Sequence, residues 1–162
     1  MMDTNVTILL VDDDKLSAMA FKRSFSALKI SNRLVGARSG IEALDRLRGQ
    51  NGCEKVPQPC LILLDMRMPY MNGIEFLEEL RADLALRHIL VFVMTGSISP
   101  ENRTRAYDMN VAGVIPKPDS GMSFLKTVEM LRAFLASDRV PGLILNITHH
   151  NVRYRRGCSL NH

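Results

Sequence analysis

Five short apolar runs recur along the chain, and each is followed by a segment with helical periodicity. The runs cover residues 6–11, 33–37, 60–65, 88–94 and 111–115. The helical segments cover residues 15–29, 40–48, 73–81, 100–110 and 120–137. Runs that are apolar throughout are typical of strands buried on both faces. The pattern therefore predicts an α/β fold in which helices cover a parallel sheet.

The apolar runs also bear on where the protein resides. The longest are of strand length, far short of the roughly 20 apolar residues that span a bilayer. No basic segment precedes the first run, so no signal peptide is expected. Cys53, Cys60 and Cys158 have neither metal-binding spacing nor the even number of a disulfide framework. We therefore expect a cytoplasmic protein with no membrane partner.

The net charge of +4 is concentrated near the carboxyl end of the chain. Residues 142–162 contain Arg153, Arg155 and Arg156 and no acidic residue, whereas residues 1–141 are nearly balanced. The sequence predicts one domain over residues 1–141 and a basic tail over residues 142–162 that forms no separate domain. We favour a solvated tail over one that contacts nucleic acid or an acidic partner.

Polar residues stand where four of the predicted strands end. In strand order they are Asp12 and Asp13, Asp65, Thr95, and Lys117. In open parallel sheets the ligand-binding crevice lies beyond the carboxyl ends of the strands, so these side chains should converge. Asp14 directly precedes the first helix, and we expect it to cap that helix instead.

Several carboxylates in one crevice need a cation to offset their repulsion. Magnesium fits better than calcium, because the oxygen ligands are few and leave room for water. The acids are contiguous rather than spaced as in an EF-hand, and no histidine or cysteine ends a strand, which argues against zinc. Carboxylate, magnesium, hydroxyl and ammonium together position a transferring phosphoryl group. Asp65 stands alone at its strand end and is the candidate nucleophile for an aspartyl-phosphate.

Four sequence blocks resemble the receiver domains of two-component response regulators. They are LLVDDD, LILLDMRMPYMNGIEFL, VFVMTGS and GVIPKP, in that order. Thr95 lies 30 positions after Asp65, and Lys117 lies 22 positions after Thr95, which is similar to the family spacing. The resemblance covers residues 5–140. The long loop before residue 60 and the long last helix look most like stand-alone regulators paired with bacterial phytochromes.

The resemblance implies a flavodoxin-like (βα)5 fold, a doubly wound parallel five-stranded sheet of order 2-1-3-4-5. It implies that Asp65 accepts a phosphoryl group from the phosphohistidine of a sensor histidine kinase. Asp13 and Asp65 would ligate Mg2+ or Mn2+ directly, with Asp12 nearby. The backbone carbonyl of Arg67 would complete the metal site.

Further roles follow from the same resemblance. Lys117 would pair with Asp65 at rest and with the phosphoryl oxygens afterwards, and Thr95 would move toward the phosphoryl group. Gly96 would leave the phosphoryl site open. In this family the peptide bond before the proline at the position of Pro118 is commonly cis.

One position departs from the family pattern. Three residues before the lysine, receiver domains usually carry Tyr or Phe, whose ring swings inward during switching, but this chain has Val114. The switch is therefore expected to run through backbone shifts of the last two strands, or through a different surface. Arg67 and Ser97 lie where such domains tune hydrolysis of the phosphoryl group.

The sequence therefore predicts a stand-alone response regulator that is a phosphoacceptor switch and not an enzyme. An alternative is a phosphatase that forms an aspartyl-phosphate, but Arg67 occupies the position where such enzymes carry a second acid. A degenerate receiver that acts as a scaffold would lack an acid, the threonine or the lysine, and none is missing. A flavodoxin-like cofactor carrier is disfavoured, because the acidic crevice would repel a flavin phosphate.

The predicted partners are a sensor histidine kinase, with a bacterial phytochrome as one candidate, and a downstream protein target. A homodimer would form through the surface of residues 100–137 or through the arm after Pro141. DNA binding is not expected, because the 21 residues after Pro141 are too few for a winged-helix module.

Overall fold

The computed structural model describes residues 5–119 and 122–137. The predicted boundary at residue 141 and the basic tail lie outside them. None of the helices in the described ranges has the length and apolar character needed to cross a membrane.

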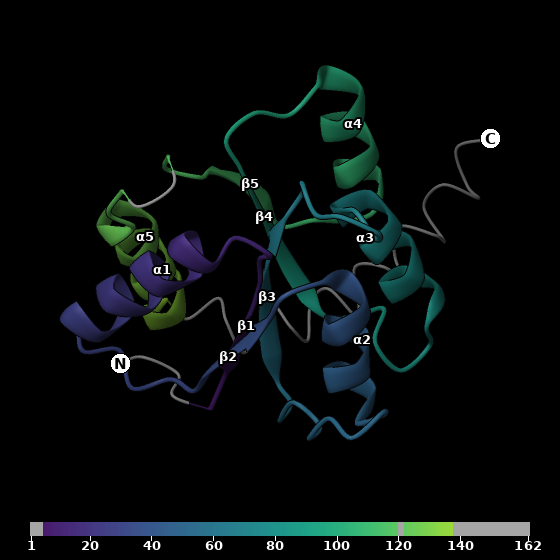
Figure 1. Cartoon of the computed structure of the whole chain (residues 1–162), viewed down its shortest axis with the longest axis horizontal. Helices are drawn as coiled ribbons and strands as arrows, with labels where there is room; N and C mark the ends of the chain where they lie inside the picture. Colours follow the sequence, from purple (N-terminus) through teal and green to yellow (C-terminus); the bar gives the residue numbers. More distant parts are fainter. Residues whose placement is uncertain (1–4, 120–121, 138–162) are drawn as a thin grey trace.

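Five parallel strands form one sheet in the order β2-β1-β3-β4-β5, which confirms the expected order (Figure 1). The strands are β1 (Thr7–Val11), β2 (Leu34–Ala37), β3 (Cys60–Asp65), β4 (Leu90–Thr95) and β5 (Gly113–Pro116). The helices are α1 (Lys15–Ala27), α2 (Gly40–Arg48), α3 (Gly73–Ala82), α4 (Pro100–Asp108) and α5 (Leu125–Ala136). Helices α1 and α5 cover one face of the sheet, and α2, α3 and α4 cover the other (Figure 1).

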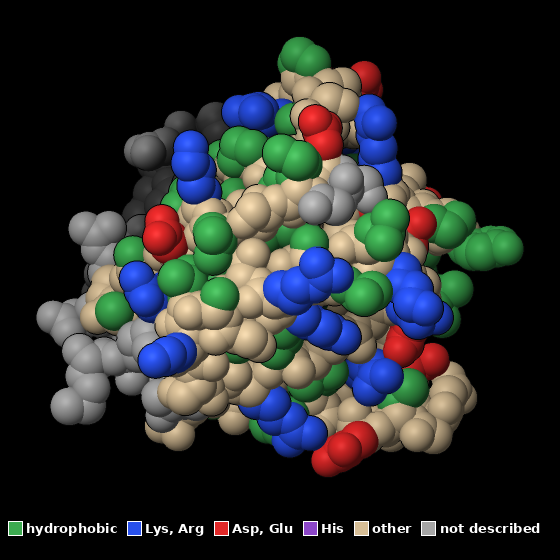
Figure 2. Space-filling model, turned by 60° about the vertical axis from the view of Figure 1, so that its left-hand side comes forward, with side chains coloured by type: hydrophobic (Ala, Val, Ile, Leu, Met, Phe, Trp, Pro, Cys, Tyr) green, Lys and Arg blue, Asp and Glu red, His purple; other side chains and the backbone are tan. Residues whose placement is uncertain are grey.

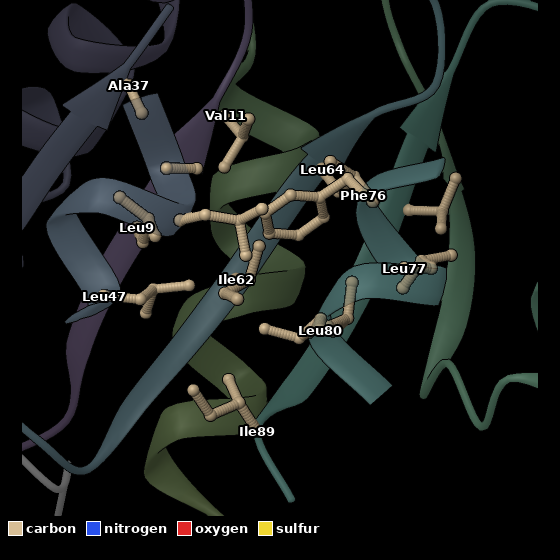
Figure 3. Packing of buried hydrophobic residues seen from close by; sticks show 14 of the residues in the cluster. Leu9, Val11, Ala37, Leu47, Ile62, Leu64, Phe76, Leu77, Leu80 and Ile89 are labelled. Carbon is tan, nitrogen blue, oxygen red and sulfur yellow. The ribbon is translucent and has the colours of Figure 1, made fainter. Parts of the chain in front are cut away.

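The two faces of the sheet carry separate hydrophobic cores. In β3, Ile62 and Leu64 point toward α2 and α3, where they pack with Phe76 and Leu80 (Figure 3). The intervening Leu61 and Leu63 belong to the cluster on the α1 and α5 side. Because successive side chains of a strand point to opposite faces, a fully apolar strand is what a sheet covered on both sides requires.

Local capping explains where most of the helices begin. The Ser99 hydroxyl accepts a hydrogen bond from the Asn102 amide at 3.1 Å, with Pro100 in the first helical position, as the sequence predicts. Asn72 and Glu75 form a reciprocal capping box at α3. These caps fix the residues at which α3 and α4 begin.

Helix α5 begins at Leu125, so the predicted start at residue 120 is wrong. The Met122 amide donates to the Asp119 carbonyl in a turn, and the Phe124 amide donates to the Ser24 hydroxyl at 3.2 Å. Phe124 is buried and lies edge-on to Phe21 of α1, with 5.6 Å between ring centroids. This tertiary contact, rather than helical periodicity, decides where the helix starts.

The side of the molecule formed by α1 and β2 is basic. Residues 15–41 contain no acidic residue, and their cations are Lys15, Lys22, Arg23, Lys29, Arg33 and Arg38. Figure 2 brings the α1 side forward and shows Lys and Arg side chains recurring across it, with few acidic ones between them. The near balance of charge over residues 1–141 therefore conceals a strongly uneven distribution.

Candidate functional site

The carboxyl ends of four strands bring the predicted residues together. Asp65 is the last residue of β3 and Thr95 the last of β4, while Asp12 and Lys117 follow β1 and β5 directly. The Lys117 ammonium lies 2.9 Å from Asp12 Oδ2 and 3.1 Å from Asp65 Oδ2. The lysine therefore joins two acids that lie 53 positions apart in the chain, as the strand-end rule predicts.

The electrostatics of this cluster are unbalanced. Asp12 and Asp65 are both buried, and a single ammonium faces them in the part of the chain that is described. Burial raises the pKa of Asp12, although the hydrogen bond and charge of Lys117 oppose that shift. Burial acts to lower the pKa of Lys117, but the hydrogen bonds and charges of the two acids outweigh it and raise that pKa. The cluster thus holds its lysine charged and still lacks positive charge.

The acids have the arrangement of a divalent-metal site. One oxygen from each of Asp12, Asp13 and Asp65 can be chosen so that all three lie within 4.8 Å of one another. Oδ2 of Asp12 is buried, and beyond its ion pair with Lys117 it accepts no hydrogen bond in the described residues. Asp13 is exposed at the mouth of the site. Hard oxygen donors with an open approach suit Mg2+, so the residues fit the predicted ion.

Thr95 takes part in the site through its backbone rather than its hydroxyl. The Lys117 amide donates to the Thr95 carbonyl at 2.9 Å, which ties the two strand ends together. The Thr95 hydroxyl donates to the carbonyl of Ser97 at 2.6 Å. In this structure, therefore, the hydroxyl is engaged by its own loop.

Arg67 makes a contact that the sequence did not predict. Its backbone amide donates to Asp65 Oδ1 at 3.3 Å, and its guanidinium donates to the Ser97 hydroxyl at 2.6 Å. This side chain links the loop after β3 to the loop after β4 beside the acidic cluster. A groove of about 650 Å³ opens next to it, between those loops and helices α3 and α4. The resemblance had named Arg67 and Ser97 as positions that tune hydrolysis of the phosphoryl group, but it gave no sign that the two side chains are in contact.

The remaining predicted positions lie around the cluster. Gly96 is exposed, and the nearest atom to a Cβ built there would be the Lys117 carbonyl oxygen at 4.0 Å, so this edge of the site is open. Val114 is half-buried in β5 and packs against the core on the α2 and α3 side. The role of Arg67's carbonyl as a metal ligand remains a prediction.

The peptide bond between Lys117 and Pro118 is trans, so the expectation of a cis bond is wrong for this structure. Among the described residues the cis bond is the one between Gln58 and Pro59. The trans form is the intrinsically favoured one even before proline. The Lys117 side chain still reaches both carboxylates with the trans bond.

Asp14 caps the first helix, as the sequence predicts. Its carboxylate accepts from the Leu16 amide at 3.0 Å and from the Ser17 hydroxyl at 2.7 Å. Asp12 accepts a hydrogen bond from the Asp14 amide at 2.9 Å, so the two acids are in contact although their side chains have different roles. The run of three aspartates is thereby divided between the acidic cluster and a helix cap.

Magnesium should stabilise the folded protein through this cluster. At a concentration about 100 times its Kd, an ion that binds only the folded state adds about 2.7 kcal/mol to the free energy of unfolding. We expect Asp13→Asn to remove most of that gain, because it removes one charge and one ligand. Asp14→Ser should keep it, because serine also caps helices. Thermal unfolding with and without MgCl2 measures the difference, and an equal loss in both variants would contradict the division of roles.

A family model, a curated relative and solved structures all match most of this chain. The family model described as response regulator receiver domain matches residues 8–129. The probable methanogenesis regulatory protein FilR2 of Methanothrix harundinacea is 37% identical over 136 residues, which cover 83% of this chain and 87% of FilR2.

Two solved structures also align over most of the chain. The phosphorylated cyanobacterial phytochrome response regulator RcpA gives a TM-score of 0.73 at 28% identity, covering 82% of this chain and 95% of RcpA. The Mn2+-bound form of response regulator Rcp1, a protein of Synechocystis sp., gives a TM-score of 0.72 at 28% identity, covering 82% of this chain and 96% of Rcp1.

Proposed function

Because the chain belongs to the receiver-domain family of response regulators, which act in two-component phosphorelays, we propose that Asp65 is its phosphoacceptor. The observation that carries this assignment is the carboxylate of Asp65 at the end of β3, bound to the Lys117 ammonium and close to two further acids. Asp12 also follows a strand and contacts the Lys117 ammonium, but Asp13 is its direct neighbour, whereas Asp65 is the single acid at the end of its strand in the described residues.

We further propose that Asp12, Asp13, Asp65 and the Arg67 carbonyl bind Mg2+, with Mn2+ as a substitute. A bound divalent cation would neutralise the acids and the incoming phosphoryl oxygens. The burial of Asp12 and Asp65 beside a single ammonium in the described residues supports this proposal, because Lys117 alone cannot offset the charge of both acids. The Mn2+ in the related Rcp1 structure supports the choice of ion.

The side chains suggest how phosphoryl transfer proceeds. An oxygen of Asp65 forms a bond to phosphorus while the bond from phosphorus to the donor histidine nitrogen breaks, and that electron pair returns to the imidazole. Lys117 is already charged and positioned, so it exchanges a carboxylate oxygen for a phosphoryl oxygen without a change of protonation. For Thr95 to bind the phosphoryl group, its hydroxyl must leave the Ser97 carbonyl.

The proposed output is a conformational switch rather than enzymatic turnover. Arg67 stands two positions after Asp65, and a guanidinium does not act as a general acid or base near neutral pH. This speaks against the phosphatase alternative. Asp65, Thr95 and Lys117 are all present, and Lys117 contacts the other two. This speaks against a degenerate scaffold.

The phosphoryl donor we propose is a sensor histidine kinase, with a downstream protein as the receiver of the signal in the cytoplasm. A phytochrome kinase is the candidate that the similarity to RcpA supports. A homodimer through α4, β5 and α5 is a further proposal, and an apolar pocket beside β5 and α5, which Phe92, Val114 and Phe134 help to line, supports part of that surface. The alternative arm after residue 141 lies outside the described residues.

Incubation with acetyl phosphate and MgCl2, followed by intact-mass and peptide mass spectrometry, tests the proposed function. We expect one added phosphoryl group per chain, located at residue 65 and absent when EDTA replaces MgCl2. A modification at any other residue, or none at all, would reject the assignment.

A further inference from the structure

We propose that Arg67 is a positioning residue for the switch: it holds Thr95 at rest through Ser97, and phosphorylation releases Thr95 by drawing Arg67 away. The inference rests on Asp65 as the phosphoacceptor. It goes beyond that function because it assigns a resting lock and the trigger that opens it.

The first step is an unbroken chain of contacts. The Arg67 guanidinium donates to the Ser97 hydroxyl at 2.6 Å, and the carbonyl of the same Ser97 accepts from the Thr95 hydroxyl at 2.6 Å. Ser97 therefore has its side chain held from one loop and its carbonyl occupied from the end of β4. A displacement of the Ser97 peptide group would free the Thr95 hydroxyl, and Arg67 resists that displacement through its hydrogen bond to the Ser97 side chain.

The second step is that Arg67 has a poor partner at rest. Its guanidinium is exposed and binds a neutral hydroxyl, and in the described residues it makes no ion pair with a carboxylate. A phosphoryl group adds about two negative charges and strong acceptor oxygens. Charge-assisted hydrogen bonds from arginine to phosphate are roughly twice as strong as neutral ones. A phosphoryl group on Asp65 is therefore the better partner.

The Arg67 side chain starts close enough to Asp65 to contact a phosphoryl group there. The Arg67 backbone is fixed beside the acceptor, because its amide donates to Asp65 Oδ1 at 3.3 Å. The side chain starts from that point and already extends along the mouth of the site to Ser97. Turning back toward Asp65 requires only side-chain rotation, while the carbonyl predicted to ligate the metal stays in place.

The loop after β4, which contains Gly96 and Ser97, has room to change its conformation. The Lys117 amide donates to the Thr95 carbonyl at 2.9 Å, so the end of β4 is held through its backbone. Gly96 between the two contacts is exposed and has open space beside it. Val114 in β5 supplies no aromatic ring to couple the Thr95 side chain to that strand, and the hydrogen bond that the Thr95 hydroxyl makes in the described residues is the one to Ser97.

The lock can be tested on the unphosphorylated protein. Methyl NMR with a 13C-labelled Thr95 γ-methyl group reports whether its hydroxyl stays with Ser97. Removal of one hydrogen bond worth about 1 kcal/mol should raise the population of released Thr95 about fivefold. We therefore expect the Thr95 signal in Arg67→Gln and in Ser97→Ala to shift toward its position in wild-type protein treated with acetyl phosphate and MgCl2.

Two further variants separate positioning from a general structural effect. Arg67→Lys keeps a cationic donor and should return the Thr95 signal most of the way to its wild-type position. Arg103→Gln removes an exposed arginine of α4 that makes no ion pair in the described residues, and should leave the signal unchanged. Ser97→Ala is a second, small change in case Arg67→Gln perturbs the fold.

The outcomes distinguish this inference from the proposed function. If acetyl phosphate does not modify the wild type, Asp65 is not the acceptor. The proposed release of Thr95 by phosphorylation is then rejected as well. If the wild type is modified but Thr95 has wild-type shifts in both Arg67→Gln and Ser97→Ala, the lock is rejected and the phosphoacceptor stands. An unchanged Thr95 signal in Arg67→Lys alone is the expected rescue.

Discussion

Replacing Asp65 with asparagine abolishes phosphoryl transfer from acetyl phosphate, whereas the wild type gains one phosphoryl group. An amide has no anionic oxygen to attack phosphorus, and it removes one of the two acids that hold the Lys117 ammonium. Intact-mass spectrometry after incubation with acetyl phosphate and MgCl2 measures the result directly. We expect a loss of at least about 1000-fold in rate, as is typical when a catalytic nucleophile is removed.

The fold of the variant should survive, which makes the test clean. Asp65 and Asp12 repel each other across the Lys117 ammonium, so one charge fewer in the cluster relieves unfavourable electrostatics. The matched control is Asp108→Asn, an exposed acid at the end of α4 that lies outside the acidic cluster. Asp108→Asn should be phosphorylated like the wild type. Modification that persists in Asp65→Asn would show that another residue is the acceptor.

The candidate site was largely predictable because its residues end strands. A buried strand identifies itself by apolar content, and its last residue must emerge at the sheet edge together with the ends of its neighbours. Asp65 and Lys117 could therefore be brought together from residue type and position, and the structure confirms their contact at 3.1 Å. The cap at Asp14 was predictable for a similar reason, because it depends on the next few residues alone.

What could not be predicted depends on long side chains and tertiary contacts. The reach of Arg67 to Ser97 spans two loops and has no periodicity in the sequence. The start of α5 is decided by Phe124 packing on Phe21. The hydroxyl of Thr95 could equally have pointed at the acidic cluster, and only the structure shows it bound to the Ser97 carbonyl.

Arg81 is the clearest case of a residue whose importance is invisible in the sequence. It lies near the end of α3, where its guanidinium donates to four backbone carbonyls of two separate loops. The acceptors are Met109 at 2.8 Å, Arg87 at 2.9 Å, Ile89 at 2.7 Å and Asn110 at 3.3 Å. Burial lowers its pKa to about 10, so it remains charged at neutral pH. The side chain thus ties α3 to the segments that lead into β4 and β5.

Replacing Arg81 with methionine should therefore lower the free energy of unfolding by about 2–4 kcal/mol. This is the largest stability effect that we expect from replacing a partly exposed side chain. Methionine keeps the apolar stem and helix propensity but leaves the carbonyls without their donor. The carbonyls of Met109 and Ile89 are in partly buried surroundings and carry most of the cost, since each unsatisfied group costs roughly 1–3 kcal/mol. Urea unfolding measures the change in the free energy of unfolding.

Two comparisons decide whether the loss comes from these hydrogen bonds. Arg103→Met makes the same chemical change at an exposed position of α4 and should stay within about 0.5 kcal/mol of the wild type. Arg81→Lys keeps the charge, but a single ammonium cannot reproduce the forked geometry and should recover only part of the loss. The amide of Ala112, which bonds the Val91 carbonyl at 2.7 Å, should exchange its hydrogen faster in Arg81→Met, because the entry to β5 is no longer tied to α3. Equal stability in Arg81→Met and Arg103→Met would mean that water replaces the guanidinium at all four carbonyls.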